Sequence, residues 1–386
     1  MNVQKNSQVP KPLPASWRWV RLGEVSTVHP GQHIMEADYN TKHDGAGYLT
    51  GPNDFSASTA IISKWTNMPK VFAESGDILV TVKGAGVGKT NFAPNEKVAI
   101  GRQLMAVRAK PSFLQRDFLC QFVKTQFAVL SARALGATVP GLGRNDLESL
   151  LIPLPPLAEQ KRIAAILNEQ MAAVEKARAA AEAQANATKA LIFSYVRNSL
   201  IKEKTHTVRL SDCMSEVKSG VGTEWRLYPV LGATRAGLAL AKEPVGRSPE
   251  RYKLVERGII FYNPMRILLG SIALVDDRDA PGITSPDYVV LKTATGILHY
   301  RWFYRWFRSL FGDRFIRTLA RGAVRERILY KRLSTGSIEI PTWTAQLEAA
   351  DKITKITPLL SAIEAQLSEI NALPAALLKR AFNGEL

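Results

Sequence analysis

The chain has 386 residues, of which 46% are hydrophobic and 8% aromatic, so it holds enough apolar material for two or three packed domains and is not globally disordered. Its 51 Lys and Arg exceed its 34 Asp and Glu, and the net charge of +17 predicts a polyanionic partner, nucleic acid rather than an anionic membrane. Two isolated cysteines and five scattered histidines predict no disulfide framework and no metal site, and the absence of an apolar run of about 18 residues predicts no transmembrane helix. A cytoplasmic location is expected.

After a polar tail over residues 1–13, residues 14–155 are expected to form a first domain of short strands, glycine turns and one helix. Its stretch VTVKGAGVGKTN looks like a nucleotide-binding loop. A Walker A loop, however, needs glycine where Lys83 stands, and Pro94 follows too soon for a long helix to begin at Lys89. The favoured interpretation is a strand–turn–strand unit, with Asp77–Lys83 as one strand and Lys97–Ala106 as a return strand. A degenerate P-loop ATPase is the alternative.

Two long helices follow the prolines near 155 and 341, within residues 156–204 and 342–386. The apolar residues of the second helix alternate in steps of three and four, which is a heptad seam that needs a partner helix. We expect the two helices to pair antiparallel as a coiled coil, rather than each lying on its own domain. Pro374 lies on the seam and is expected to kink or interrupt it. The predicted helix-pairing residues are Ile163, Leu167, Met171 and Val174 in the first helix and Ile353, Ile356, Leu360, Ile363, Leu367 and Ile370 in the second.

Residues 205–341 repeat the first domain. Val20-Arg21-Leu22 matches Val208-Arg209-Leu210, and Leu147, Ile152 and Pro155 match Leu333, Ile338 and Pro341. The offsets stay between 182 and 188, so a domain followed by a long helix occurs twice. The predicted fold class is α/β (α+β), with two similar domains separated by two long helices.

Several other stretches look catalytic but lack the residues that catalysis needs. Ile272–Val275 before Asp276 could pass for a Walker B strand, but it has no Walker A partner. Tyr262-Asn263-Pro264 lacks the second proline and the aromatic of an adenine methyltransferase motif. Because no nucleophile set, carboxylate pair or metal cluster is evident either, we expect no catalytic residue and no metal site in this chain.

The segment from Tyr300 to Arg332 contains ten Lys and Arg but two acids, and it is rich in aromatics. Its tryptophans and phenylalanines are expected in the core, whereas its arginines suit phosphates and guanine edges. On a helix, Arg301, Arg305 and Arg308 share one face. The predicted DNA-binding residues are Lys83, Lys89, Arg102, Arg144, Arg266, Arg301, Arg305, Arg308, Arg317, Arg321, Arg325, Arg327, Lys331 and Arg332.

The stretches IPLPPLAEQKRIAAIL (152–167) and ALPAALLKRAFNGEL (372–386) strongly resemble the central and C-terminal regions of the DNA-specificity (S) subunits of type I restriction–modification enzymes. LPASWRWVRLGEV, GDILVTVKGAGVGK and YNPMRILLGSIAL look like parts of the target-recognition domains of that family. The resemblance covers nearly the whole chain, except that Ile340–Thr344 lacks the PLPPLAEQ run of the first repeat. If partners dock through that run, the two repeats need not dock them equally.

The resemblance implies a sequence-specific, non-catalytic subunit within a methyltransferase and endonuclease complex. Two target-recognition domains, 14–155 and 205–341, would each read half of a bipartite site in double-stranded DNA, and the paired helices would fix the spacer. Two modification subunits, which are adenine-N6 methyltransferases, and restriction subunits would dock on it. S-adenosylmethionine, ATP and Mg would belong to those partners and no cofactor to this chain. The alternative is a solitary DNA-binding adapter without a modification partner.

Overall fold

The computed structural model describes residues 12–56, 59–84, 86–135, 141–202, 204–242, 244–320 and 327–386; of the predicted tail, residues 1–11 lie outside this part. The chain folds as two compact units. Unit 1 contains the chain up to residue 179 together with 368–386, and unit 2 contains 180–367. Both long helices contribute to both units.

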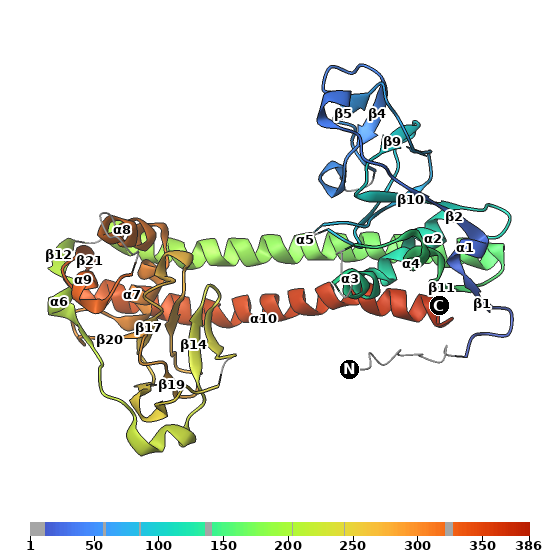
Figure 1. The fold of residues 1–386 in the computed structure, drawn as a ribbon. Helices are drawn as coiled ribbons and strands as arrows, with labels where there is room; N and C mark the ends of the chain where they lie inside the picture. The colour runs from blue at the N-terminus through green and yellow to red at the C-terminus, as the bar shows by residue number, and fades with distance from the viewer. Residues whose placement is uncertain are drawn as a thin grey trace. The chain divides into compact units, whose positions relative to one another are not determined.

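The elements of unit 1 are mostly short, and helices follow the strands (Figure 1). In chain order they are β1 (Arg18–Arg21), α1 (Leu22–Val25), β2 (Ser26–Pro30), the 3₁₀ helix η1 (Glu36–Asp38), β3 (Tyr39–Asn40), β4 (Ala46–Leu49), η2 (Pro52–Asp54), β5 (Lys64–Thr66), β6 (Phe72–Ala73), β7 (Ile78–Thr81), β8 (Thr90–Phe92), β9 (Val98–Ile100), β10 (Leu104–Ala109), α2 (Arg116–Thr125), α3 (Phe127–Leu135), α4 (Arg144–Glu148), β11 (Leu151–Leu154) and the first part of α5 (Leu157–Lys202).

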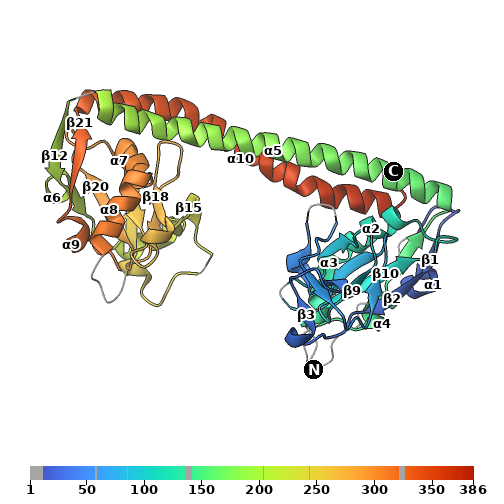
Figure 2. The same ribbon diagram turned by 90° about the horizontal axis from the view of Figure 1, so that it is seen from above.

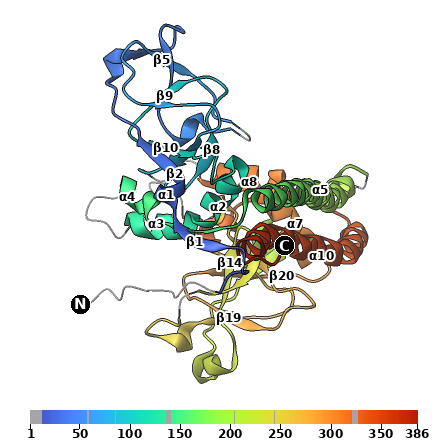
Figure 3. The ribbon, with the colours of Figure 1, turned by 90° about the vertical axis from the view of Figure 1, so that its right-hand side faces the viewer.

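Unit 1 has two larger sheets, in the orders β2-β10-β7-β8 and β3-β5-β4-β9-β6, and a ribbon of β1 with β11. The first sheet packs its apolar face against α2, whose Phe118 and Phe122 are buried in the same core as Ile78 and Val80. The five-stranded sheet lies on the other side of β10 from α2 (Figure 3). The expectation of one helix per domain was incomplete, because α2, α3 and α4 follow one another.

Unit 2 repeats this order with fewer strands. Its elements are the end of α5, β12 (Thr205–Arg209), α6 (Leu210–Cys213), β13 (Met214–Glu216), η3 (Gly222–Leu227), β14 (Leu231–Thr234), β15 (Gly237–Leu240), η4 (Pro249–Arg251), β16 (Lys253–Val255), β17 (Ile260–Tyr262), η5 (Ile267–Leu269), β18 (Ile272–Leu274), β19 (Gly282–Thr284), β20 (Val289–Thr293), α7 (Tyr300–Phe307), α8 (Leu310–Ala320), α9 (Tyr330–Leu333), β21 (Ser337–Pro341) and most of α10 (Trp343–Phe382).

The internal repeat predicted from the sequence is confirmed by the strand pairing. The four-stranded sheet of unit 2 has the order β13-β20-β17-β18, which matches β2-β10-β7-β8 element for element. In the ribbons, Val20 pairs with Ile152 and Val208 pairs with Ile338, so residues matched in the sequence occupy matching places in the register. The four-stranded sheet and the ribbon therefore have the same topology in both units, whereas the five-stranded sheet of unit 1 is matched in unit 2 by the two-stranded sheets β14-β15 and β16-β19.

A buried glutamine fixes the start of the long helix in each unit. Gln160 accepts a hydrogen bond from the backbone N–H of Gln115 (2.8 Å) and donates to the carbonyls of Phe113 and Pro155 (both 2.9 Å). Gln346 makes the same three bonds, to His299 (2.8 Å), Ile297 (2.9 Å) and Pro341 (3.0 Å). Both side chains are fully buried. We call each of these a glutamine clamp. The sequence analysis missed both.

The two long helices run antiparallel in each unit. In unit 1, Ile163 and Leu167 near the start of α5 share a core with Leu377 and Ala381 near the end of α10. In unit 2, Ile192 late in α5 shares a core with Ile353, Leu360 and Ile363 early in α10. Figure 2 shows α5 and α10 side by side. The predicted antiparallel pairing is confirmed, with α5 of 46 residues and α10 of 40.

All ten predicted helix-pairing residues are buried or partly buried; the partly buried ones are Met171, Ile356 and Leu367. The expected interruption at Pro374 is wrong, because α10 is helical without a break from Trp343 to Phe382. Proline removes one helix N–H, and here packing on both sides of it maintains the helix: Ile370 is buried, and Leu377 packs against the core of unit 1.

Candidate nucleic-acid interface

The glycine-rich stretch of the first repeat is the turn between β7 and β8, and the two strands pair antiparallel. Gly84 and Gly88 adopt φ values of 85° and 87°, which side chains other than glycine rarely tolerate. Lys83 and Lys89 are both exposed. Since Lys89 precedes a strand and not a helix, the turn does not open a helix as a phosphate-binding loop must, and the strand–turn–strand interpretation is confirmed. The return strand is β8, however, and residues 97–106 divide between β9 and β10, of which β10 pairs with the other edge of β7.

Val82 joins this turn to two other loops. Its N–H donates to the carbonyl of Gln103 in the β9–β10 turn, and its carbonyl accepts from the N–H of Leu142, just before α4; both distances are 2.8 Å. The turn of residues 82–89, the β9–β10 turn and residues 141–143 therefore lie together, and we call them loop cluster 1. Cluster 1 and the start of α4 bring together four predicted cations: Lys83, Lys89, Arg102 and Arg144. Of these, Arg144 is paired with Glu148 (2.7 Å).

Unit 2 builds a matching loop cluster 2. The turn of residues 263–271 joins β17 to β18, and its Pro264 carbonyl accepts from the N–H of Ile328, just before α9 (3.2 Å). Proline has no N–H, so only one of the two bonds made by Val82 is possible here. Arg266, Arg327 and Lys331 are exposed on this cluster and the adjoining α9, and Arg332 is partly buried.

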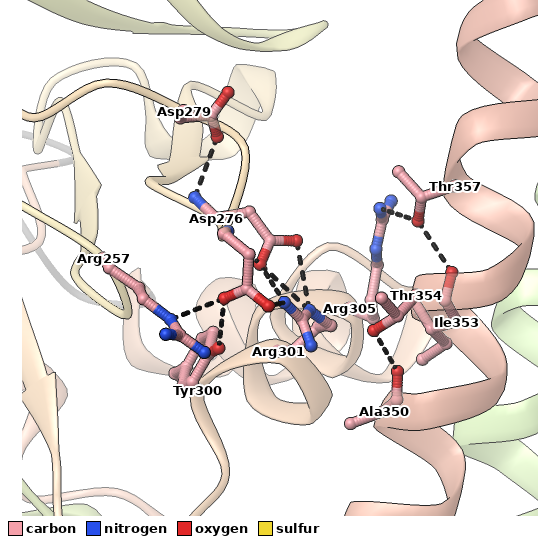
Figure 4. A network of polar contacts seen from close by, with 11 residues as sticks. Arg257, Asp276, Asp279, Tyr300, Arg301, Arg305, Ala350, Ile353, Thr354 and Thr357 are labelled. Carbon is pink, nitrogen blue, oxygen red and sulfur yellow. Dashed lines mark hydrogen bonds and ion pairs between the residues drawn. The ribbon is translucent and has the colours of Figure 1, made fainter.

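Arg301 was predicted to bind DNA, and the structure contradicts this. Its side chain is buried, its Nε donates to Asp276 (3.0 and 3.1 Å), and its Nη2 is paired with Asp276 and, at 3.0 Å, with Asp277 (Figure 4). Burial alone would lower the pKa of Arg301, but the hydrogen bonds and ion pairs with the two carboxylates raise it overall. Asp276 is thus a structural partner and not a Walker B acid.

Three further arginines, in or next to α7 and α8, make contacts within the protein. Arg308 donates to the carbonyls of Ile272 (2.9 Å) and Arg235 and to the Tyr304 hydroxyl (2.8 Å), so it holds the β14–β15 hairpin to α7. Arg317 is paired with Asp313 (2.8 Å). Arg305 is partly buried beside α10. Arg321 and Arg325 lie outside the described residues. The predicted core role of the aromatics of α7 is confirmed, because Trp302, Phe303, Trp306 and Phe307 are all buried.

In the described part of the chain, no group of three or more His, Cys, Asp or Glu side chains could hold a metal ion. Burial raises the pKa of the Cys120 thiol, and it raises that of Cys213 to about 11, so neither is poised as a nucleophile. Among the same residues, no helix has the length and apolar character to cross a bilayer.

Comparisons with known proteins agree with this architecture. Residues 14–182 match the family model of the type I restriction modification DNA specificity domain. The predicted MjaX specificity subunit of Methanocaldococcus jannaschii is 32% identical over 157 residues, which are 39% of this chain and 36% of that protein. The EcoBI specificity subunit of Escherichia coli is 19% identical over 96% of this chain and 86% of that protein. The resemblance to the DNA-specificity subunits of type I restriction–modification systems, expected from the sequence, is confirmed by these matches.

Solved structures show that this chain shares its fold with chains of type I restriction–modification systems. One of them, solved to explain complex assembly and conformational transition, has a TM-score of 0.66 at 18% identity, and the match covers 98% of this chain and 100% of that chain. The S subunit from M. genitalium has a TM-score of 0.54 at 16% identity, and the match covers 97% of this chain and 98% of that chain. The match to the MjaX subunit spans about a third of that relative's length.

Proposed function

We propose that this specificity subunit reads a bipartite target in double-stranded DNA, one half with each loop cluster, and that it has no catalytic activity itself. The observation that carries the proposal is the repetition of the cluster. The same hairpin turn, bonded through the same backbone carbonyl to the segment before a short helix, occurs in both units and presents exposed cations in each. Cations on glycine-containing loops suit phosphates and base edges, and the net charge of +17 favours a polyanion.

We further propose that the subunit scaffolds two modification subunits and, in a complete system, restriction subunits, in the cytoplasm. The names of the relatives support this, and so do the two long helices, which present polar faces beyond their shared seam. S-adenosylmethionine, ATP and Mg would then be bound by the partners. Binding of two half-sites by one chain makes the second contact intramolecular, which raises specificity without new contacts.

The DNA-reading role is tested by fluorescence anisotropy on a methylation-mapped target duplex, with the subunit alone and with its modification subunits. Affinity should fall steeply with salt, and Lys89→Ala should reduce the slope of log affinity against log salt by about 0.9, one phosphate contact. Lys176→Ala, an exposed lysine of α5 away from the loop cluster, is the matched control and should leave the slope unchanged. Binding that is insensitive to salt would contradict the proposal. Binding by the subunit alone at full affinity would favour the solitary adapter.

The spacer role is tested by inserting one heptad in each helix, after Ala179 in α5 and after Leu367 in α10, so that the seam stays in register. Seven residues add about 10.5 Å of helix, which corresponds to about three base pairs. Methylated adenines mapped in cells should then show a longer spacer and unchanged half-sites. Altered half-site sequences would refute the idea that the helices measure the spacer.

A further inference from the structure

A cleft of about 1320 Å³ opens in unit 2 between the β14–β15 hairpin, η5, α7, α8 and the segment of α10 from Thr357 to Glu364. We call it the α7–α10 cleft. Six cations line it: Lys189, Arg235, Arg266, Arg305, Arg308 and Arg317. Four acids line it too, but three already have partners: Asp276 is bound to Arg301, Asp313 to Arg317 and Glu364 to Lys189. The fourth, Asp279, accepts from the backbone of Asp276.

Arg305 is a partly buried cation of this cleft that has no carboxylate partner among the described residues, and its guanidinium lies 5.3 Å from the centroid of the Tyr304 ring. Its Nε is buried and has no hydrogen-bond partner, and its one bond is a long one from Nη2 to the Thr357 hydroxyl (3.4 Å). Figure 4 shows its side chain beside α10, apart from the Asp276–Arg301 pair. Burial, and then the neighbouring charge of Arg308, lowers the pKa of Arg305. An unpaired, partly buried guanidinium is unfavourable, and an anion in the cleft would relieve it.

The internal repeat shows that packing does not require this charge. The glutamine clamps show that Gln115 in unit 1 is equivalent to His299 in unit 2. Counting six residues on from each, Gln121 of α2 is the equivalent of Arg305 of α7. In unit 1, Gln121 donates to the Asn168 side chain on α5 at 2.8 Å, and Thr354 of α10 is the counterpart of Asn168. A neutral amide pair therefore fills the same position in the same fold. The arginine in unit 2 replaces that pair with a cation that faces a cleft.

We propose that the α7–α10 cleft is a phosphate-binding site organised around Arg305, with Arg266 and Arg235 contributing positive charge from its walls. Guanidinium groups bind phosphate oxygens through charge-assisted, often paired hydrogen bonds. The phosphate has two possible sources: the backbone of the bound duplex, or a free phosphate or nucleotide. With the duplex as the source, the inference rests on the proposed function. In the first case, Arg305 supplies affinity and orientation without sequence information.

The test converts unit 2 to the arrangement of unit 1 with Arg305→Gln and Thr354→Asn together, which keeps the helix contact. Arg314→Gln removes an exposed charge from α8 outside the cleft and is the matched control. With the modification subunits present, the double variant should lose the same factor of affinity for the target duplex and for one with scrambled half-sites. Its salt slope should fall by about 0.9, whereas the control keeps the wild-type slope.

A second arm uses inorganic phosphate and ATP without DNA, measured as the shift in thermal unfolding temperature. If DNA binding is unchanged but these ligands stabilise the wild type and not the double variant, the phosphate is a free one. If neither arm distinguishes the variants, the proposal is wrong. It is also wrong if the variant loses only its modification subunits, since the cleft would then hold an acidic protein segment. If the wild type binds no duplex, the proposed function is refuted. The measurement with phosphate and ATP then still shows whether the cleft binds phosphate.

Discussion

The glutamine clamp of unit 1 allows a quantitative prediction. Replacing Gln160 with Met keeps the volume but removes three hydrogen bonds, to Gln115, Phe113 and Pro155, at a position with 0% exposure. At about 1 kcal/mol for each bond, the variant should lose about 3 kcal/mol of local stability, and more if the Pro155 carbonyl stays dry. The start of α5 and the start of α2 are held by this one side chain, so both should open more often.

Hydrogen exchange followed by mass spectrometry measures this local opening separately for each segment of the chain. The amides of α2 and the first turns of α5 should exchange about 100-fold faster in Gln160→Met, because each 1.4 kcal/mol is a factor of ten. The amides of α7 should keep their wild-type rates, and Gln346→Met should give the reverse pattern. A change below about threefold, or equal changes in both units, would refute the assignment of the clamp as a local anchor.

Three further outcomes follow from buried groups of unit 2 and from the proline in α10. Trp302→Phe removes the indole bond to the Ser199 hydroxyl (2.9 Å) and should cost unit 2 about 1 to 3 kcal/mol in urea unfolding, whereas Ser199→Ala should cost less because the ring stays. The folded pKa of Cys213 lies above that of a free thiol, so its contribution is intact below pH 9 and is lost as pH rises toward 11. The difference in free energy of unfolding between the wild type and Cys213→Ala should therefore fall by about 2 to 3 kcal/mol between pH 9 and pH 11 and stay constant below pH 9. Pro374→Ala restores an N–H to the interior of α10 and should raise the unfolding temperature; an unchanged or lower value would show that packing favours the proline.

The sequence predicted what depends on short-range periodicity. The bounds of α5 and α10 were predicted to within a few residues because each helix follows a proline, α5 starts with a long stretch free of Gly and Pro, and the apolar residues of α10 recur every three or four positions. The repeat was visible because its offset is nearly constant. The turn at residues 82–89 was predicted from its glycines and the proline that follows them.

Contacts between distant residues were not predictable in this way. Arg301 looked like part of a basic helix face, and its partner Asp276 is 25 residues earlier on a strand end. The glutamine clamps had one signal, a Gln at the same place in LAEQ and WTAQ, but nothing in either stretch indicated burial. The five-stranded sheet of unit 1 is built from strands of two to four residues, which are too short for an alternating pattern to show.

Unit 1 is discontinuous along the chain, and this affects how it is made. Its core includes Ala381 and Phe382, and the Phe382 ring packs on those of Phe118 (5.1 Å) and Phe122 (5.6 Å). Unit 2 is one uninterrupted segment, 180–367. During synthesis, most of unit 1 leaves the ribosome first, but its core stays incomplete until residues 368–386 are added. Unit 2 is made later, yet all of its residues have been synthesised before that point. Unit 1 is therefore the unit that most needs protection from aggregation while the chain grows.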